Sequence, residues 1–199
     1  MNAKNYDRLM TEQINGLDYR PKLLLHCCCA PCSTACLERL EGHFDITVLF
    51  YNPNIGGGEY EKRKAELIKF INLKGGINFA DCDRGEEEFY ARVRGLESQK
   101  EGGKRCLECF GLRLEKTACL ADKGGYDYFA TTLTVSPLKD AQAINAIGES
   151  LQRGKTKWLY SDFKKRNGYL RSIELSKTYG LYRQKYCGCV YSRQTLENK

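Results

Sequence analysis

One stretch constrains the fold more than any other part of the chain: residues 22–36 read KLLLHCCCAPCSTAC. The apolar run at residues 23–25 predicts a buried parallel strand, and it leads directly into a series of cysteines. Pro31 suits the first turn of a helix, so we expect Cys28 and Cys29 on the strand-to-helix turn and Cys32 at the helix start. Free N–H groups and a partial positive charge at a helix N-terminus favour thiolates. The stretch therefore predicts thiolate ligands for a metal.

The rest of the chain alternates predicted helices and strands. Further strands are expected at residues 44–51, 77–82 and 126–132, and helices at 6–15, 32–40, 59–73, 86–96, 104–125 and through Ile144, Ile147 and Leu151. This order predicts a three-layer α/β fold with a mostly parallel, doubly wound, Rossmann-like sheet, in one domain covering residues 1–199. A basic, irregular C-terminal extension follows, with a possible edge strand at 158–163 and a short helix at 172–180. Ligands of such sheets gather at the carboxyl ends of the strands.

Composition indicates where such a chain works. It has no apolar run as long as a membrane span, and its first residues are polar and mixed in charge rather than signal-like. A cytoplasmic location is therefore expected. Eleven cysteines, an odd number, in a reducing compartment favour metal binding or redox chemistry over a disulfide scaffold.

The cysteines fall into groups that suit metal ligation. The candidate ligands are Cys28, Cys29 and Cys32; Cys106 and Cys109; Cys187 and Cys189. A structural zinc or an iron–sulfur cluster uses about four ligands, so these seven thiols are too many for one such site. A four-thiolate cluster with a second metal on the remaining three thiols would use them all. The other cysteines, Cys27, Cys36, Cys82 and Cys119, are interpreted as small buried apolar side chains.

Three other features near the predicted strand ends have two interpretations each. His26 could donate to a cluster sulfur or orient a ligand, but a histidine at the end of a strand is more often satisfied within the fold. Asn52 and Asn54 flank Pro53 and are either plain turn residues or substrate contacts. The run at residues 56–58, GGG, lacks the Lys-Ser/Thr ending of a Walker phosphate loop and is interpreted as a flexible loop.

Several motifs, in this order over most of the chain, resemble the epoxyqueuosine reductase QueH family: HCCCAPCS, FYNPNI, EYEKRK, KRCLECFGLRLEKTA, FATTLTVSPLKD and YRQKYCGCVYS. The resemblance implies cobalamin-independent conversion of epoxyqueuosine to queuosine at the wobble position of tRNA. It also implies a 4Fe-4S cluster next to a mononuclear iron.

The resemblance carries over residue by residue. The family's H-x-C-C-A-P-[C/D] motif falls on His26, Cys28, Cys29, Ala30, Pro31 and Cys32, its C-x-x-C on Cys106 and Cys109, and its C-G-C on Cys187 and Cys189. All seven cysteines are candidate metal ligands, and all but Cys32 are candidate cluster ligands. Cys32 stands where some relatives have Asp, so a thiolate replaces a harder oxygen ligand. The motifs leave open which thiols hold the cluster and which the second metal.

The reaction and the charge distribution imply two partners. Removal of an epoxide oxygen needs two electrons and two protons, and the chain lacks a G-x-G-x-x-G fingerprint, so an external donor such as ferredoxin or flavodoxin is expected. Residues 151–199 carry 12 Lys/Arg and 3 Asp/Glu. Such a tail suits tRNA phosphates, although it could equally be a solvated surface. The candidate contacts are Lys164, Lys165, Arg166, Arg171, Arg183 and Lys185, with Tyr182 or Tyr186 available to stack on a base.

Two other functions compete with this reading. One is an iron–sulfur tRNA thiolase that activates its base with ATP. Such enzymes usually have an S-G-G-x-D-S-like loop after the first strand, where this chain reads HCCCAPCS. The other is a non-catalytic zinc module that binds RNA through the basic tail, and zinc without sulfide would favour it.

Overall fold

The computed structural model describes residues 3–197, with side chains up to Arg193. Its strands are β1 (Lys22–His26), β2 (Asp45–Leu49), β3 (Asn78–Ala80), β4 (Tyr128–Thr131) and β5 (Lys157–Trp158). Its helices are α1 (Tyr6–Asn15), α2 (Ala30–Leu40), α3 (Gly57–Lys74), α4 (Glu86–Arg92), α5 (Lys104–Lys123), α6 (Ala141–Ser150), α7 (Gly168–Thr178) and α8 (Val190–Glu197), with a 3₁₀ turn η1 (Thr132–Val135).

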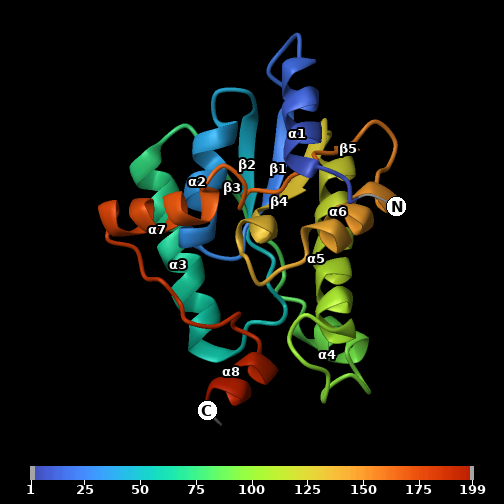
Figure 1. Ribbon diagram of the computed structural model, residues 1–199, viewed down its shortest axis with the longest axis vertical. Helices are drawn as coiled ribbons and strands as arrows, with labels where there is room; N and C mark the ends of the chain where they lie inside the picture. The colour runs from blue at the N-terminus through green and yellow to red at the C-terminus, as the bar shows by residue number, and fades with distance from the viewer. Residues whose placement is uncertain (1–2, 198–199) are drawn as a thin grey trace.

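Across residues 3–197 the strands form a single five-stranded sheet in the order β3-β2-β1-β4-β5, and every neighbouring pair is parallel. Helices lie on both sides of it, with α2, α3 and α7 on one side and α5 and α6 on the other (Figure 1). The predicted α/β class with a parallel sheet is confirmed. Because all strands run the same way, their carboxyl ends meet at one edge of the sheet.

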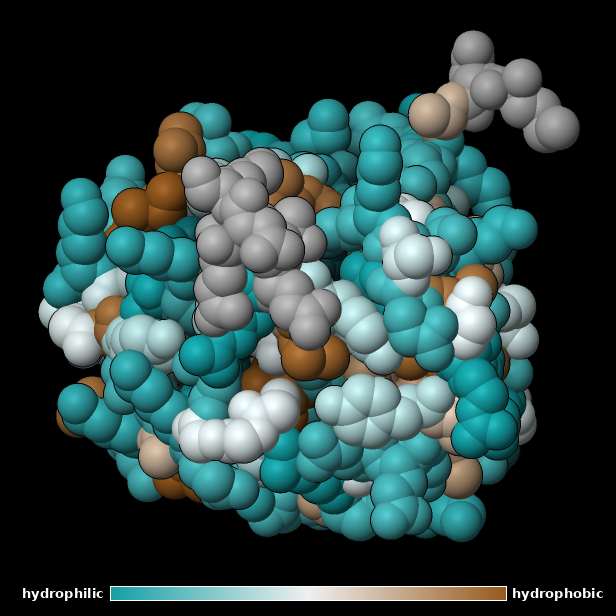
Figure 2. Space-filling model, turned by 90° about the horizontal axis from the view of Figure 1, so that it is seen from below, coloured by the Kyte–Doolittle hydropathy of each residue, from teal (hydrophilic) through white to brown (hydrophobic). Residues whose placement is uncertain are grey.

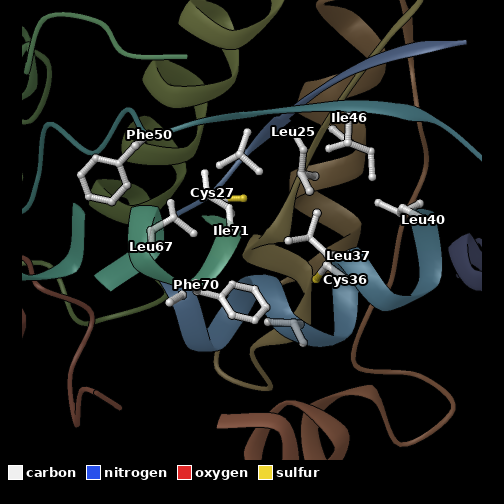
Figure 3. Packing of buried hydrophobic residues seen from close by; sticks show 14 of the residues in the cluster. Leu25, Cys27, Cys36, Leu37, Leu40, Ile46, Phe50, Leu67, Phe70 and Ile71 are labelled. Carbon is white, nitrogen blue, oxygen red and sulfur yellow. The ribbon is translucent and has the colours of Figure 1, made fainter. Parts of the chain in front are cut away.

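The central strand β1 contributes to two separate apolar cores, because successive side chains of a strand point to opposite faces. Leu23 and Leu25 pack in the layer beneath α2 and α3. Figure 3 shows Leu25 among the other buried side chains of this layer. Leu24 packs in the other layer, against residues of α5 and α6. Both faces of β1 are therefore covered, which explains its uninterrupted run of leucines.

Helix α2 begins at Ala30, two residues before the predicted start at Cys32. Cys29 is the N-cap, and its Sγ accepts a hydrogen bond from the backbone N–H of Cys32 at 3.4 Å. Pro31 occupies the first turn, where its missing N–H costs nothing. The hydroxyl of Ser33 donates to the Cys29 carbonyl at 2.8 Å. The helix start thus holds the cysteine-bearing turn in one conformation.

The C-terminal quarter contains less strand and more helix than the sequence predicts. The expected edge strand at 158–163 is wrong beyond the start of the segment. The Leu159 N–H still donates to the Phe129 carbonyl of β4 at 3.0 Å, but distant side chains satisfy the N–H groups that follow. Gln13 accepts from the N–H of Tyr160 at 2.9 Å, and Asn145 accepts from that of Ser161 at 3.0 Å. The predicted helix at 172–180 is α7, which begins earlier, at Gly168, and packs along α2. The sequence analysis missed α8.

No helix within residues 3–197 is long and apolar enough to cross a membrane. The end of the molecule at which α4 and α8 lie is covered mostly by hydrophilic residues, with smaller hydrophobic areas between them (Figure 2).

Candidate metal centre

The first group of thiols lies at the carboxyl end of β1. The Sγ atoms of Cys28, Cys29 and Cys32 all lie within 4.8 Å of one another, and those of Cys28 and Cys29 are 3.8 Å apart. Cys28 and Cys29 are buried, and Cys32 is partly exposed. Within the described part of the chain, no other group of three ligating side chains is this close. Three convergent soft ligands fit a thiophilic metal or a cluster.

The second group, Cys187 and Cys189, comes from the segment that joins α7 to α8. The backbone of Cys189 pairs with that of Ile55 in an isolated antiparallel bridge. Arg63 of α3 donates to the carbonyls of Cys187 at 2.9 Å and Tyr186 at 3.1 Å. These contacts tie the Cys-Gly-Cys segment to the loop after β2, at the same edge of the sheet as the first group.

The third group, Cys106 and Cys109, lies in the first turn of α5. Cys109 is buried in the same apolar cluster as Cys28, Cys29 and Cys189, and Cys106 packs against that cluster. The Gly102 N–H donates to the Cys106 Sγ at 3.2 Å. The fold therefore gathers the three predicted groups on one side of the sheet, although it leaves their assignment as ligands a prediction.

The cysteines interpreted as packing residues lie elsewhere. Cys27 and Cys36 are fully buried in the layer beneath α2 and α3 (Figure 3). Cys109 belongs to the other apolar cluster. Cys82 is only partly buried at the margin of the other core, and Cys119 is partly exposed on α5. The packing interpretation holds for Cys27 and Cys36, whereas Cys82 and Cys119 are less buried than predicted.

Two cations that the sequence analysis did not single out surround the thiols. Lys139 Nζ lies 3.6 Å from the Cys187 Sγ. Arg113 of α5 is 2% exposed and donates to the side-chain oxygen of Asn54, whose amide nitrogen lies 3.9 Å from the Cys187 Sγ. Among the side chains that the structure describes, no carboxylate forms an ion pair with Lys139 or Arg113. The charge of Arg113 lies close to Cys109 and Cys187 instead, and that of Lys139 lies close to Cys187.

This arrangement distributes charge unequally over the thiols. Hydrogen bonds from Cys29 and Cys32 lower the pKa of Cys28, and Arg113 adds to the effect. Burial raises the pKa of Cys187, but Lys139 and Arg113 outweigh it and bring the pKa below its ordinary value. Burial and the neighbouring Cys28 raise the pKa of Cys29 to about 12. Of the three thiols at the helix start, Cys28 is therefore the one most readily deprotonated.

His26 is satisfied within the fold. Its Nε2 donates to the Tyr51 carbonyl at 2.9 Å, so its Nδ1 is unprotonated and accepts from the Thr131 hydroxyl at 2.8 Å. Burial, with Arg113 adding to it, lowers the pKa of His26 to about 4, and the ring stays neutral. Asn52 donates to the Cys27 carbonyl at 2.9 Å and is structural, whereas Asn54 belongs to the site.

A family model described as epoxyqueuosine reductase QueH matches residues 23–195. The chain belongs to the epoxyqueuosine reductase QueH family. The QueH of Streptococcus pyogenes serotype M1 is 48% identical over 198 residues, which cover 94% of this chain and 78% of that protein. The QueH of Staphylococcus epidermidis is 42% identical, covering 94% of this chain and 84% of that protein, and that of Thermotoga maritima is 36% identical, covering 85% and 89%. The predicted family and the oxidoreductase class are confirmed.

In this member of the QueH family, a cavity of about 370 Å³ opens beside the thiols. Cys28, Cys32 and Cys187 form part of its wall. Gln184 also lines it and donates from its amide nitrogen to the Cys29 Sγ at 2.8 Å, while its amide oxygen is buried with no hydrogen-bond partner among the described side chains and backbone. A ligand in this cavity would lie directly against the thiols.

The basic residues predicted to contact tRNA differ in the structure: some pair with acidic side chains, and others line the cavity. Three of them form ion pairs: Lys164 with Asp162, Arg166 with Asp7 and Arg171 with Glu38. Lys165 is exposed, and Arg183 and Lys185 line the cavity. Of the two candidate stacking residues, Tyr186 lines the cavity, whereas the ring of Tyr182 is covered by the Lys62 ammonium at 3.4 Å. The geometry thus favours Arg183, Lys185 and Tyr186 over the other candidates.

Proposed function

We propose that this protein reduces epoxyqueuosine to queuosine at the wobble position of tRNA, without cobalamin. Four of the seven clustered thiols would bind a 4Fe-4S cluster, and the remaining three an adjacent mononuclear iron. Membership of the QueH family supports the reaction. The observation that carries the cofactor proposal is a pair of cations, the buried Arg113 and the partly buried Lys139, that lie beside thiols instead of carboxylates.

The donor set fits such a group. Thiolates are the ligands of iron–sulfur clusters, and three converge within 4.8 Å at Cys28, Cys29 and Cys32. A buried cation without an anion is penalised by several kcal/mol, so Arg113 requires negative charge beside it. The partly buried Lys139 adds a second positive charge, next to Cys187. A thiolate-bound cluster supplies that charge. The N–H groups of Gly102 and Gln184, directed at Cys106 and Cys29, would donate to ligand sulfurs, which is one way a protein sets a cluster potential.

The chain's own groups suit the deoxygenation. The epoxide carbons become an alkene, and the oxygen leaves as water after uptake of two electrons and two protons. When bound, the metal centre would supply single electrons and Lewis acidity. Lys139 and Arg113 lie in the cavity wall, where fixed positive charge stabilises negative charge developing on the departing oxygen. The amide oxygen of Gln184, which has no partner, is available to hold a donor group of the substrate.

The basic surface around the cavity would bind the tRNA substrate, and the reaction also needs an electron donor. The target nucleoside would be splayed out of the anticodon loop into the cavity, as required for chemistry on a base. The exposed Lys165 and Lys185 and the partly exposed Arg183 would contact phosphates. Because Lys164, Arg166 and Arg171 already have acidic partners, we expect them to contribute less. Electrons would come from an external donor such as ferredoxin or flavodoxin.

The test is conversion of tRNA that carries epoxyqueuosine. Protein prepared without oxygen is mixed with the tRNA and reduced flavodoxin or ferredoxin, and digested nucleosides are measured by mass spectrometry. Queuosine should form with no added cobalamin, and it should not form with the Cys28→Ala variant or without the donor. Unchanged epoxyqueuosine with fully iron-loaded protein and a competent donor would contradict the proposal.

A further inference from the structure

The cavity beside the thiols is strongly basic. Five cationic residues line it: Arg63, Arg113, Lys139, Arg183 and Lys185. Among the residues that the structure describes, Glu101 is the single acidic residue in the same lining. Lys139 contacts the Cys187 Sγ, and Arg113 is buried close to the thiols, while Arg183 and Lys185 lie on the segment after α7 and remain partly or largely exposed. The outer cations therefore face whatever approaches the cavity, and their charge complements a polyanion.

A largely solvent-exposed leucine, Leu138, lies in the wall of the same cavity. Leu138 lines the cavity and is 74% exposed, more than any other large hydrophobic side chain that the structure describes. It is not on a loose segment. The Lys139 N–H donates to the Ser136 carbonyl at 3.2 Å, the Leu138 N–H donates to the Ser136 hydroxyl at 3.3 Å, and Lys139 then contacts Cys187. The turn thus presents Leu138 in a defined position beside the metal centre.

Aromatic rings and guanidinium groups lie in the same lining. The guanidinium of Arg183 lies 5.4 Å from the ring centre of Tyr169, and that of Arg63 lies 5.5 Å from the ring centre of Tyr186. All four residues line the cavity. Flat cationic and aromatic surfaces, interleaved with positive charge, are the features with which proteins bind unpaired bases and the backbone that joins them.

We propose that Leu138 is a base-contacting wedge. It would pack against an unpaired base next to the target nucleotide, holding the anticodon loop open while Arg183 and Lys185 contact its phosphates. This inference rests on the proposed function, because it assigns the RNA surface of the same site. Leu133 and Val135 of the same lining are buried, so Leu138 is the leucine that an approaching base would meet. An exposed apolar side chain at a basic cavity suits the apolar face of a base. A protein partner docked through hydrophobic contact would be expected to cover a larger apolar patch.

The experiment uses the full chain, loaded with iron without oxygen, and a fluorescein-labelled anticodon stem–loop RNA with guanosine at the wobble position. Fluorescence anisotropy gives the dissociation constant at several salt concentrations. Leu138→Ala should raise the constant about fivefold or more, with an unchanged salt slope because no charge is lost. Leu138→Trp should bind at least as tightly as the unmodified protein, since an indole also stacks. Lys185→Ala should weaken binding and reduce the slope by about one.

The matched control is Leu73→Ala. Leu73 is a similarly exposed leucine, 62% exposed, on the outer side of α3 and absent from the cavity wall. Its removal should leave RNA binding unchanged. Binding by Leu138→Ala within about twofold of the unmodified protein, or an equal loss in Leu73→Ala, would overturn the wedge. An effect of Leu138→Ala on binding of the electron donor, with none on RNA, would assign this surface to the donor and also overturn it.

The outcome is separable from that of the proposed function, because the probe carries no epoxide. A protein that binds this RNA through Leu138 but never forms queuosine would contradict the reductase mechanism alone. A protein that forms queuosine while Leu138→Ala binds and turns over normally would contradict the wedge alone.

Discussion

Cys27 and Cys28 are neighbours in the sequence, yet they lie in opposite environments. Cys27 is fully buried in the apolar layer beneath α2 and α3, where burial raises the pKa of its thiol. Cys28 lies on the other side, where hydrogen bonds from two thiols and the charge of Arg113 lower its pKa. The same residue type is thus a packing group in the apolar layer and a candidate ligand in the thiol site. What differs is access to cations and to other thiols, which only the fold supplies.

The largest effect that would test this difference is expected from Cys28→Ala. It removes the thiol with the lowered pKa from the convergent set, so bound iron should fall sharply and reductase activity by at least about a hundredfold. Iron per chain and queuosine formation are the measurements. Full iron content and activity would remove Cys28 from the site.

Arg113→Met should have the next largest effect, because it leaves the buried thiols without their main compensating charge. We expect metal affinity to fall by about 10- to 100-fold, measured by competition with a chelator. Arg92→Met is the matched control, since Arg92 pairs with Glu108 and Glu115 on the surface and not with thiols. Equal iron retention in both variants would mean that Arg113 serves only packing.

Gly188→Ala tests whether the Cys-Gly-Cys segment must pack closely against Arg63 and Ile55. Gly188 has φ +98°, and a Cβ there would lie 2.9 Å from both Arg63 Nη1 and Ile55 Cγ1. The variant should lose about 1–3 kcal/mol of stability and some bound iron. Gly180→Ala, with φ +60° but open space around the added Cβ, should cost only about 1 kcal/mol and retain its iron. Urea unfolding and iron content distinguish them.

Cys36→Ala tests whether the cysteines of the apolar layer serve packing alone. Cys36 is fully buried beside Leu37 and Leu40, so loss of its sulfur should lower the free energy of unfolding by about 1 kcal/mol. Bound iron per folded chain should stay unchanged. Iron loss without any loss of stability would contradict the division of the cysteines between the two sides.

The smallest effect is expected from Glu38→Gln, at the surface of the apolar layer. A hydrogen bond from Arg171 lowers the pKa of Glu38 below its ordinary 4.5. The pair therefore stabilises the fold above that ordinary pKa, and the contribution is lost as pH falls through the lowered value. Because solvent screens the pair, the variant should melt less than about 4 °C lower at pH 7 and match the unmodified protein well below the lowered pKa. A larger difference in acid than at pH 7 would contradict this sign.

Local patterns predicted much of the fold. The leucines of β1, the cap at Cys29 and the spacing of Cys106 and Cys109 act over a few residues, so they can be read from the sequence. The early end of β5 cannot, because Gln13 and Asn145 reach it from distant segments. Nothing in the sequence distinguishes Arg113 from the other basic residues of the predicted helix at 104–125, and only tertiary packing brings it to the thiols. The motif SPLKD, which contains Lys139, can be recognised in the sequence, but the contact of its lysine with Cys187 cannot.

The basic tail illustrates the same limit. Charge alone made six residues of the tail equivalent as phosphate contacts. Acidic partners from α1 and α2 pair with Arg166 and Arg171, and the course of the chain places Lys185 at the cavity. Those partners lie more than 100 residues away in the sequence. Net charge therefore predicts that a segment is basic, but not which cations remain available.

The most direct test of the central claim, that the cations and thiols at the carboxyl edge hold a redox-active centre, is the metal content of protein purified without oxygen. Iron, zinc and acid-labile sulfide are measured per chain, with electron paramagnetic resonance after reduction. The account predicts more than about four irons with about four sulfides and a cluster signal. Zinc without sulfide would contradict it, because a redox-inert ion cannot deliver the electrons.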